Sequence, residues 1–392
     1  MRRARCALSF VKLFPRTLAL LFLLIALASG GCKRAAAPGA TTPIRIGEFS
    51  SLTGREAGLG QYTHMGVLLA LEELNAAGGL LGRPVEVIAE DTQSKAGESV
   101  IATRKLVSRD HVIALIGEGA SGRCLEGAPI AQDGHVPLVT PSATNPKVTE
   151  IGDYIFRVCF TDPFQGTVMA KFARDSLKAH RVALLVDVGA SYSVGLAEFF
   201  KERFKADGGV IVAEQKFAGG DKDFRAQLTA IKAANPDAIF APCYYGEAGL
   251  ILFQARQLGI TLPILGGDGY EAPELIEVAG AAAEGAYFPV HFSLESTDAR
   301  SRDFVQKFTA HYQKPPTGVS ALGYDAMMLL ADAIRRAGTT DGPAIRDALA
   351  ATHDFDGVTG RIAIDVARNA RKSASIIQVR KGRFQFVETV AP

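Results

Sequence analysis

Small and hydroxyl-bearing residues directly follow two apolar runs in the first half of the chain. Ala120-Ser121-Gly122 comes after the run 112–116, and Pro141-Ser142-Ala143-Thr144 comes after the run 136–140. Hydroxyls and free backbone N–H groups at the start of a helix suit a carboxylate, because they donate hydrogen bonds and the helix dipole favours an anion. Each segment alone could equally be an ordinary helix cap. Together they indicate a site for a small acidic group at the ends of two strands.

Two tyrosines and one aspartate occupy the same kind of position further along the chain. Tyr192, Tyr244 and Asp268 each follow closely on a short apolar run. Glycines flank Asp268, as they do in many turns, so a turn residue is the alternative. Its carboxylate could also accept hydrogen bonds from an ammonium group. Donors on one unit that face this acceptor on another would bind a zwitterion, such as an amino acid.

Signatures of enzymes and metal sites are weak or missing in the sequence. The segment 117–122 fits the glycine pattern of a dinucleotide-binding loop, but it follows the third strand of its series, and no acidic residue ends the next strand. The sequence has no G-x-S-x-G or H-E-x-x-H motif, and its seven histidines are scattered singly. A lone histidine is more often a surface or packing residue than a metal ligand. We therefore expect a binding protein with no catalytic residues, metal or cofactor.

Short apolar runs alternate with helical stretches, which predicts parallel sheets with crossover helices on both faces. A first series ends near Thr161-Asp162-Pro163, and a second series follows it. Two α/β units in tandem are expected, because the length exceeds what one hydrophobic core usually organises. The predicted strands are 44–49, 85–89, 112–116, 136–140, 181–187, 210–213, 238–240, 263–265, 361–364 and 375–379. The predicted helices are 62–77, 97–108, 194–206, 224–233, 248–258 and 320–337.

The first 43 residues have the order of an export signal. Basic residues precede the uncharged run 17–28, which is typical of a signal peptide and too short for a membrane helix of about 20 residues. The run ends at Ser29-Gly30-Gly31-Cys32, which resembles a bacterial lipobox, whose cysteine becomes lipidated. We predict a signal peptide at 1–31 and a lipid-anchored tether at 32–43, with Cys32 as the lipid site.

The rest of the chain is mildly acidic. Residues 1–43 hold seven Lys or Arg and no Asp or Glu, so leaving them out changes the net charge from +2 to −5. This charge gives no electrostatic reason to expect nucleic-acid binding. The cysteines beyond Cys32 are Cys124, Cys159 and Cys243. Their odd number leaves at least one thiol unpaired, and we expect at least two of them to be buried apolar thiols.

Seven motifs are spread over nearly the whole chain beyond residue 43. They are Ile46–Gly54, Ile116-Gly117, Thr140–Thr144, Phe156-Arg157, Tyr192–Gly195, Gly266–Gly269 and Gly323–Ala326. With them the chain resembles the leucine/isoleucine/valine-binding protein family, the receptors of branched-chain amino acid-type ATP-binding cassette importers. The resemblance implies the periplasmic binding protein type I fold, which is α/β with two doubly wound Rossmann-like lobes joined by a three-strand hinge. Lobe 1 would hold 44–161 and 291–375, and lobe 2 would hold 162–290 and 376–392.

The same resemblance implies that a cleft between the lobes binds a small amino acid-like ligand. Ser121 and Thr144 would hold its carboxylate, and Asp268 would receive its α-ammonium. The sequence leaves open whether Arg123 enters this cleft. The remaining implied ligand-binding positions are the backbone groups of Ala120, Ser142 and Ala143, the closing tyrosines Tyr192 and Tyr244, and the apolar side-chain pocket residues Leu59 and Val319.

The implied function is that of an extracytoplasmic solute-binding protein in the periplasm or cell envelope. The ligand would stabilise a closed state, which the membrane permease of an ATP-binding cassette importer recognises. No cofactor and no nucleic-acid partner is implied. The alternatives are a receptor for an amide, a urea or an aromatic carboxylic acid, and a ligand-sensing ectodomain.

Overall fold

The computed structural model describes residues 42–391. The predicted signal peptide, Cys32 and nearly all of the predicted tether lie outside these residues. Residues 43–391 belong to one compact unit. Across the described part of the chain, no helix combines the length and the apolar character that crossing a membrane requires.

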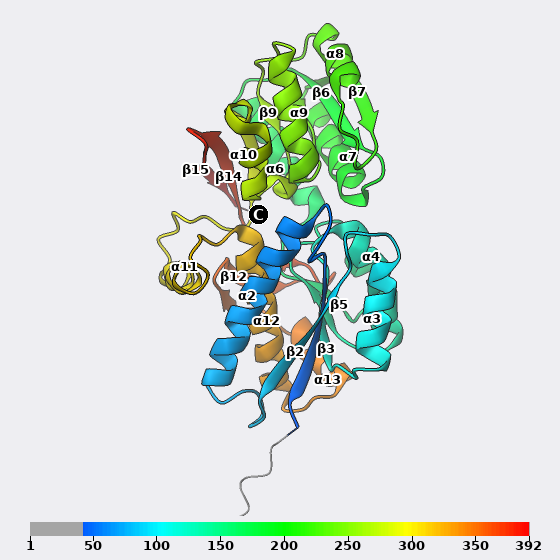
Figure 1. Ribbon diagram of the computed structural model, residues 1–392, viewed down its shortest axis with the longest axis vertical. Coiled ribbons are helices and arrows are strands. Elements are labelled where there is room, and N and C mark those ends of the chain that lie inside the picture. The colour runs from blue at the N-terminus through cyan, green and yellow to red at the C-terminus, as the bar shows by residue number, and fades with distance from the viewer. Residues whose placement is uncertain (1–41, 392) are drawn as a thin grey trace, which may run out of the picture. The chain divides into compact units, whose positions relative to one another are not determined.

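The first sheet has five parallel strands in the order β2-β1-β3-β4-β5, and Figure 1 shows helices packed beside it. Because the strands are parallel, their carboxyl ends meet at one edge, where the hydroxyl-bearing loops follow β3 and β4. The strands are β1 Ile44–Ser50, β2 Val85–Asp91, β3 Ala114–Ile116, β4 Leu138–Thr140 and β5 Ile155–Arg157. The helices between them are α2 Ala57–Ala76, α3 Glu98–Ser108, α4 Ser121–Asp133 and α5 Lys147–Glu150.

Helix α2 begins five residues earlier than the predicted start at Tyr62. Its first two turns contain Gly58 and Gly60, which weaken a helical pattern in the sequence. The structure explains both glycines by close packing. A Cβ at Gly60 would collide with the carbonyl group of Ser51, and one at Gly58 would crowd the hydroxyl of Tyr245. Packing therefore overrides the low helix propensity of glycine here.

The second sheet has seven strands in the order β15-β14-β10-β9-β8-β6-β7. Strands β6 to β10 pair in parallel, while β14 and β15 are antiparallel to their neighbours. The strands are β6 Arg181–Asp187, β7 Val210–Phe217, β8 Ala238–Phe240, β9 Ile264–Leu265, β10 Ala286–Val290, β14 Ala374–Arg380 and β15 Arg383–Val390. The helices of this part are α6 Asp162–Asp175, α7 Ser191–Ala206, α8 Arg225–Ala233, α9 Tyr245–Gln257 and α10 Pro273–Ala279, with short 3-10 turns at Asp268–Tyr270 and Gly280–Ala283.

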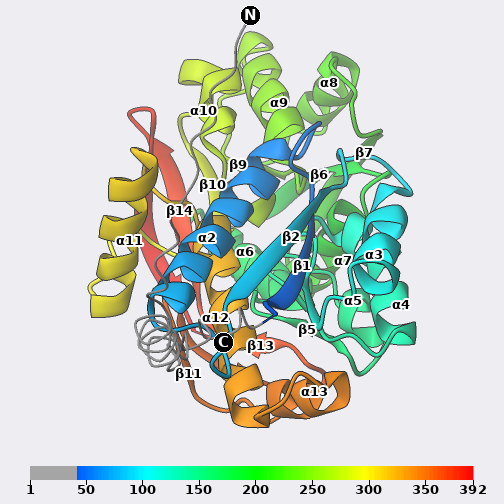
Figure 2. The same ribbon diagram turned by 60° about the horizontal axis from the view of Figure 1, so that its bottom comes forward.

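The segment between β10 and β14 returns to the first sheet. Its long helix α12, Gly318–Ala337, lies beside α2 (Figures 1 and 2), and Gly66 of α2 touches the backbone of Ser320. Helix α12 begins with a capping box between Thr317 and Ser320, whose side chains satisfy backbone N–H groups at the start of the helix. The other elements here are α11 Ala299–Tyr312, α13 Gly342–Ala350 and a small sheet of β11 Phe355–Gly357, β12 Gly360–Ile364 and β13 Ala370–Arg371.

The chain passes between the two large sheets three times: after β5, after β10 and before β14. We call the first sheet with its helices, α11–α13 and the small sheet lobe 1, and the second sheet with its helices lobe 2. Strand β14 enters lobe 2 at Ala374, two residues before the predicted boundary at 376. Strand β10, which contains Pro289, was absent from the predicted strands.

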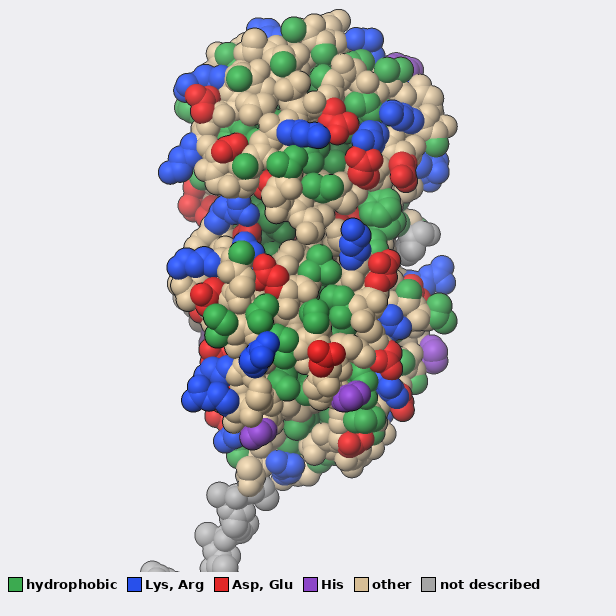
Figure 3. Space-filling model, turned by 90° about the vertical axis from the view of Figure 1, so that its right-hand side faces the viewer, with side chains coloured by type: hydrophobic (Ala, Val, Ile, Leu, Met, Phe, Trp, Pro, Cys, Tyr) green, Lys and Arg blue, Asp and Glu red, His purple; other side chains and the backbone are tan. Residues whose placement is uncertain are grey.

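The surface charge and the cysteines bear on nucleic-acid binding and on thiol chemistry. On the face shown in Figure 3, basic and acidic side chains are interspersed, with no basic stripe of the kind that binds nucleic acid. Cys124, Cys159 and Cys243 are all buried and free. Burial raises the pKa of the Cys124 and Cys159 thiols to about 12, so they are not reactive thiolates at neutral pH.

Candidate functional site

A small cavity lies where the carboxyl ends of the parallel strands of the two large sheets face each other. Its volume is about 10 Å³, close to the space that a single water occupies. The two lobes therefore lie close around it in this arrangement. Lobe 1 lines it with Leu59, Gly119, Ser121, Ser142 and Val319, and lobe 2 lines it with Tyr192, Tyr244, Asp268 and Gly269.

Seven of the ten predicted ligand-binding residues thus line one cavity, and three do not. The backbone of Ala143 is used by the protein, since its N–H donates to Thr140 Oγ1 at 3.1 Å and its carbonyl accepts from Arg157 at 2.6 Å. The Thr144 hydroxyl is buried and has no hydrogen-bond partner among the described residues. Ala120 is the N-cap residue of α4, immediately beside the cavity-lining Ser121.

The lobe 1 wall of the cavity is built from two tight loops. Helix α4 begins at Ser121 with no side-chain cap, so the N–H groups of its first turn are open to an acceptor. Ser121 Oγ accepts a hydrogen bond from the backbone of Asn145 at 3.3 Å, which joins the loops after β3 and β4. A Cβ at Gly119 would collide with Ser142 Oγ. Close packing therefore accounts for Gly117 and Gly119 of the pattern that fits a dinucleotide-binding loop, whereas Gly122 has room for a side chain.

The lobe 2 wall presents a carboxylate whose orientation is fixed. Asp268 Oδ1 accepts from Gln165 Nε2 at 3.1 Å, and Asp268 Oδ2 lies 2.9 Å from His291 Nε2. The Asp268 backbone N–H also donates to Gln165 Oε1 at 3.3 Å. Burial lowers the pKa of His291, although the carboxylate of Asp268 opposes this effect, so the imidazole is neutral at pH 7 and donates through Nε2. Asp268 is therefore more than a turn residue.

An aromatic wall completes lobe 2. The rings of Tyr192 and Tyr244 stack with centroids 5.2 Å apart and planes at 24°. The Tyr192 hydroxyl accepts from the backbone N–H of Gly269 at 3.0 Å, so it also holds the loop that carries Asp268. Burial raises the pKa of both tyrosines, and they stay neutral. Their rings can cover a ligand without adding charge.

Three polar residues near Asp268 were not predicted. Gln165 and Asp162 lie on the first turn of α6, where Gln165 Nε2 donates to Asp162 Oδ1 at 2.8 Å. Burial raises the pKa of Asp162 to about 7, and the charge of Asp268 adds to this. His291 follows β10 directly. Tyr244 was predicted because it follows a strand, and residues at the carboxyl ends of parallel strands lie at the ligand-binding edge of a sheet. The same rule would have identified His291 if the sequence had also predicted strand β10.

Several polar contacts among the described residues join the lobes around the cavity. Their effect is to hold the two walls together, because each pairs a lobe 1 group with a lobe 2 group. They include Arg55 Nη1 with Glu247 Oε1 at 3.3 Å, Gly58 N with the Tyr245 hydroxyl at 3.0 Å, Asn145 Nδ2 with Ser191 O at 2.9 Å, Gly318 N with Glu271 Oε1 at 2.6 Å, and Asp162 N with Thr144 O at 3.0 Å.

Arg123 does not line the cavity. Its guanidinium donates to Ser94 O at 3.0 Å and to Glu126 at 3.2 Å, both in lobe 1. Glu271, in contrast, is buried between the lobes. Burial raises its pKa to about 8, which the N–H of Gly318 only partly opposes.

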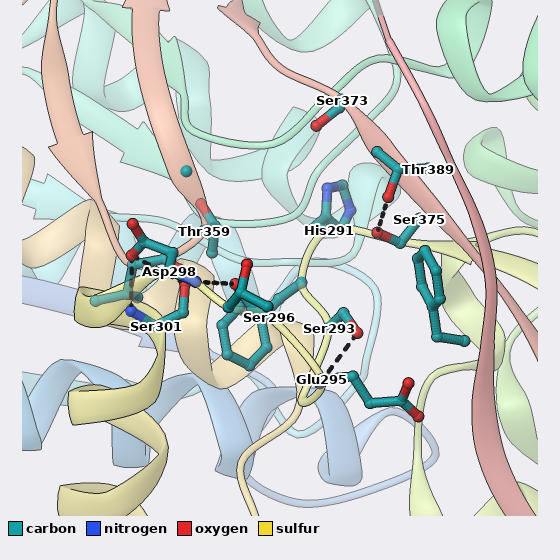
Figure 4. A pocket seen from close by; sticks show the side chains of 15 residues that line it. His291, Ser293, Glu295, Ser296, Asp298, Ser301, Thr359, Ser373, Ser375 and Thr389 are labelled. Atoms are coloured by element: carbon teal, nitrogen blue, oxygen red, sulfur yellow. Dashed lines mark hydrogen bonds between the residues drawn. The ribbon is translucent and has the colours of Figure 1, made fainter.

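A larger, open pocket of about 530 Å³ lies on the hinge (Figure 4). It is lined by the segment after β10, by the β11–β12 turn, and by residues of β14 and β15. Many of its side chains are hydroxyls, among them Ser293, Ser296, Thr359, Ser373 and Ser375. His291 lines it too, so this residue touches the hinge pocket on one side and Asp268 on the other.

The sequence pattern of the periplasmic binding proteins matches residues 43–383. The chain belongs to this family. It is 31% identical over 328 residues to the leucine-, isoleucine-, valine-, threonine- and alanine-binding protein of Pseudomonas aeruginosa, a match that covers 83% of this chain and 87% of that protein. The predicted family is therefore confirmed.

Solved structures agree with this membership. A leucine-binding protein from Thermotoga maritima has a TM-score of 0.85 and 41% identity, covering 89% of this chain and 99% of that one. The branched-chain amino acid transporter substrate-binding protein from Streptococcus pneumoniae, in complex with isoleucine, has a TM-score of 0.85 and 37% identity, covering 89% and 100%. The predicted type I fold is confirmed, and the chain belongs with transporter solute-binding proteins, not with enzymes. Membership implies a periplasmic location.

Proposed function

We propose that this chain captures an α-amino acid in the cavity between its lobes and delivers it to the permease of an ATP-binding cassette importer. One observation carries the proposal. Hydroxyl and N–H donors at Ser121 and Ser142 line one wall of the cavity, and the carboxylate of Asp268 lines the other. Donors opposite an anion complement a zwitterion, whose carboxylate and ammonium lie on one carbon.

Each wall has a distinct part in this proposal. The start of α4 receives the ligand carboxylate, because open N–H groups and the helix dipole both favour an anion there. Asp268 receives the α-ammonium. Tyr192 and Tyr244 cover the ligand from lobe 2. Since the ligand bridges both lobes, it stabilises the closed arrangement that a permease would distinguish from an open one.

The side-chain pocket favours an apolar group. Leu59 and Val319 are both buried at the cavity, and both come from lobe 1 helices that pack together. The relative from Pseudomonas aeruginosa is named for five amino acids with small or branched side chains. We propose a ligand of this kind, with Leu59 and Val319 as the residues that set its size.

We also propose that the mature chain is anchored through a lipid on Cys32. The support is the sequence order of basic residues, apolar run and Ser29-Gly30-Gly31-Cys32. Wild-type protein should incorporate a labelled lipid precursor and partition with membranes, whereas Cys32→Ala should do neither. Equal labelling of the two proteins would exclude this site.

The test of ligand class is a calorimetric screen of the twenty amino acids. Binding should also raise the melting temperature, since a ligand at 100 times its Kd stabilises the folded state by about 2.7 kcal/mol. A protein that binds none of the twenty would contradict the proposal.

An aromatic carboxylic acid is the second candidate. A solute-binding protein from Rhodopseudomonas palustris in complex with 3,4-dihydroxybenzoic acid has a TM-score of 0.80 and 25% identity to this chain. The stacked pair Tyr192 and Tyr244 could cover such a ring. Asp268 argues against it, because a plain acid brings no cation to a buried carboxylate. The screen therefore includes 3,4-dihydroxybenzoate, and tight binding of this compound alone would favour the second candidate.

A further inference from the structure

Two buried carboxyl groups share one amide beside the cavity. Gln165 Nε2 lies 2.8 Å from Asp162 Oδ1 and 3.1 Å from Asp268 Oδ1. The nearby cations are engaged elsewhere, because Arg157 donates to backbone carbonyls and Lys372 donates to Thr359. Two like charges this close in a buried site disfavour each other.

Hydrogen bonds distinguish the two carboxyl groups. Asp268 accepts a second N–H, from His291 Nε2 at 2.9 Å, whereas Asp162 Oδ2 has no hydrogen bond of good geometry among the described residues. Burial raises the pKa of Asp162 to about 7, although the nearby Thr144 hydroxyl and the Gln165 amide oppose this effect. N–H donors favour an anionic acceptor. The carboxyl group with the additional N–H donor is Asp268, the member of the pair that lines the cavity.

The position of His291 is set from outside the cavity. Its ring stacks on Phe160 with centroids 3.6 Å apart, and it directly follows β10, so the first and second crossings between the lobes hold it. It lines the hinge pocket (Figure 4) and is absent from the cavity lining. A ligand in the cavity would therefore meet Asp268 and not His291.

We propose that His291 is a positioning residue that donates to Asp268 and holds its carboxylate aimed at the cavity, and thereby makes the site select an α-ammonium over an α-hydroxyl. This inference rests on the proposed function. An ammonium requires an anionic acceptor in a buried site, whereas a hydroxyl is neutral and can also pair with a protonated carboxyl. Loss of the His291 donor should then weaken binding of an amino acid far more than binding of its hydroxy analogue.

The experiment measures a ratio of affinities with the full chain. Calorimetry gives the Kd of L-leucine against 2-hydroxy-4-methylpentanoate and of L-alanine against lactate, after the screen of the twenty amino acids has shown which pair binds. His291→Phe keeps a ring against Phe160 and removes the donor. A hydrogen bond to a charged group changes affinity about tenfold or more. The ratio of the Kd of the hydroxy acid to the Kd of the amino acid should therefore fall by about that factor in His291→Phe.

Two further variants separate positioning from a loss of packing. His291→Gln places an amide N–H near the position of Nε2 and should restore most of the preference. Phe160→Leu disturbs the ring packing without touching the donor and should weaken both ligands alike. If His291→Phe does not fold, His291→Asn replaces it, because the shorter amide does not reach Asp268.

The outcomes distinguish this inference from the function beneath it. If the wild type binds amino acids and His291→Phe keeps the full preference over hydroxy acids, the positioning role is wrong and the proposed function stands. If His291→Phe lost the same factor of affinity for the amino acid and for its hydroxy analogue, His291 would be a packing residue only. If the wild type binds none of the twenty amino acids, the proposed function and this inference are both wrong.

Discussion

Replacing Asp268 by asparagine removes the carboxylate from the cavity and keeps the shape of the side chain. Its carbonyl oxygen can still accept from Gln165 Nε2, which lies 3.1 Å from Asp268 Oδ1. Its amide nitrogen then faces His291 Nε2, which donates to Asp268 Oδ2 at 2.9 Å, so this hydrogen bond is lost unless the imidazole changes its tautomer. The side chain is buried, so no bulk water replaces the lost charge. The perturbation therefore tests the charge of Asp268 and not the shape of the loop.

The expected loss follows from the charge pair with the ligand ammonium. Truncating one member of a buried, hydrogen-bonded charge pair costs about 2–5 kcal/mol, partly because the other charge stays buried without a partner. At about 1.4 kcal/mol for each factor of ten, affinity for the amino acid should fall about 30-fold or more. The melting temperature without ligand should fall by no more than the loss of the His291 hydrogen bond explains, since the size and shape of the side chain are kept.

The assay is calorimetry on wild type, Asp268→Asn and a control, Asp303→Asn. Asp303 lies on the surface helix α11 and pairs with Lys307 at 2.8 Å, so its change removes the same charge far from the cavity. The control should bind the ligand like the wild type. If Asp268→Asn also bound it with unchanged affinity, the ligand would carry no ammonium at this position and the amino-acid proposal would fail.

Three further perturbations test other parts of the argument. Arg55→Ala removes the ion pair with Glu247 across the lobes, so ligand affinity should drop a few-fold and become less sensitive to salt in a titration from low to high ionic strength. Burial raises the pKa of Glu271 to about 8, so the folded protein holds a proton that the unfolded chain releases. The free energy of unfolding should therefore fall as pH rises from about 4.5 to about 8. Glu271→Gln should reduce this dependence of the melting temperature on pH. Gly66→Ala would place a methyl group against the backbone of α12 and should lower the free energy of unfolding, measured by urea denaturation, by about 1–3 kcal/mol. The control is Gly246→Ala, at a helical glycine with open space around it, which should not destabilise the fold.

The strand pattern of the sequence predicted most of what positions the site. Apolar runs buried on both faces identify parallel strands, and the residues after them must meet at one sheet edge. Ser121, Tyr192 and Asp268 were found by this rule, and all three line one cavity. The rule reached no further than the strands it recognised. It missed β10 and, with it, His291.

Contacts between distant segments account for the rest of the site. The partners of Asp268 are Gln165 and His291, which lie 103 and 23 residues away in sequence. Gln165 has no local pattern that marks it, and His291 is marked only by the end of β10. That the two meet at Asp268 depends on how the crossings bring α6 and β10 together. Arg123 illustrates the converse, since it is close in sequence to Ser121 yet turns toward Ser94 and Glu126.

The sequence by itself determined the class of fold, the tandem arrangement and the loops that end at the cleft, because these depend on periodicity and on the geometry of parallel strands. Only the tertiary structure decided how the carboxyl groups there are held. Asp162 and Asp268 are both aspartates in the sequence, but burial raises the pKa of Asp162, whereas Asp268 lines the cavity and accepts an additional N–H from His291. Burial and hydrogen bonding set the properties of a carboxyl group, and both arise only when segments far apart in the chain are packed together.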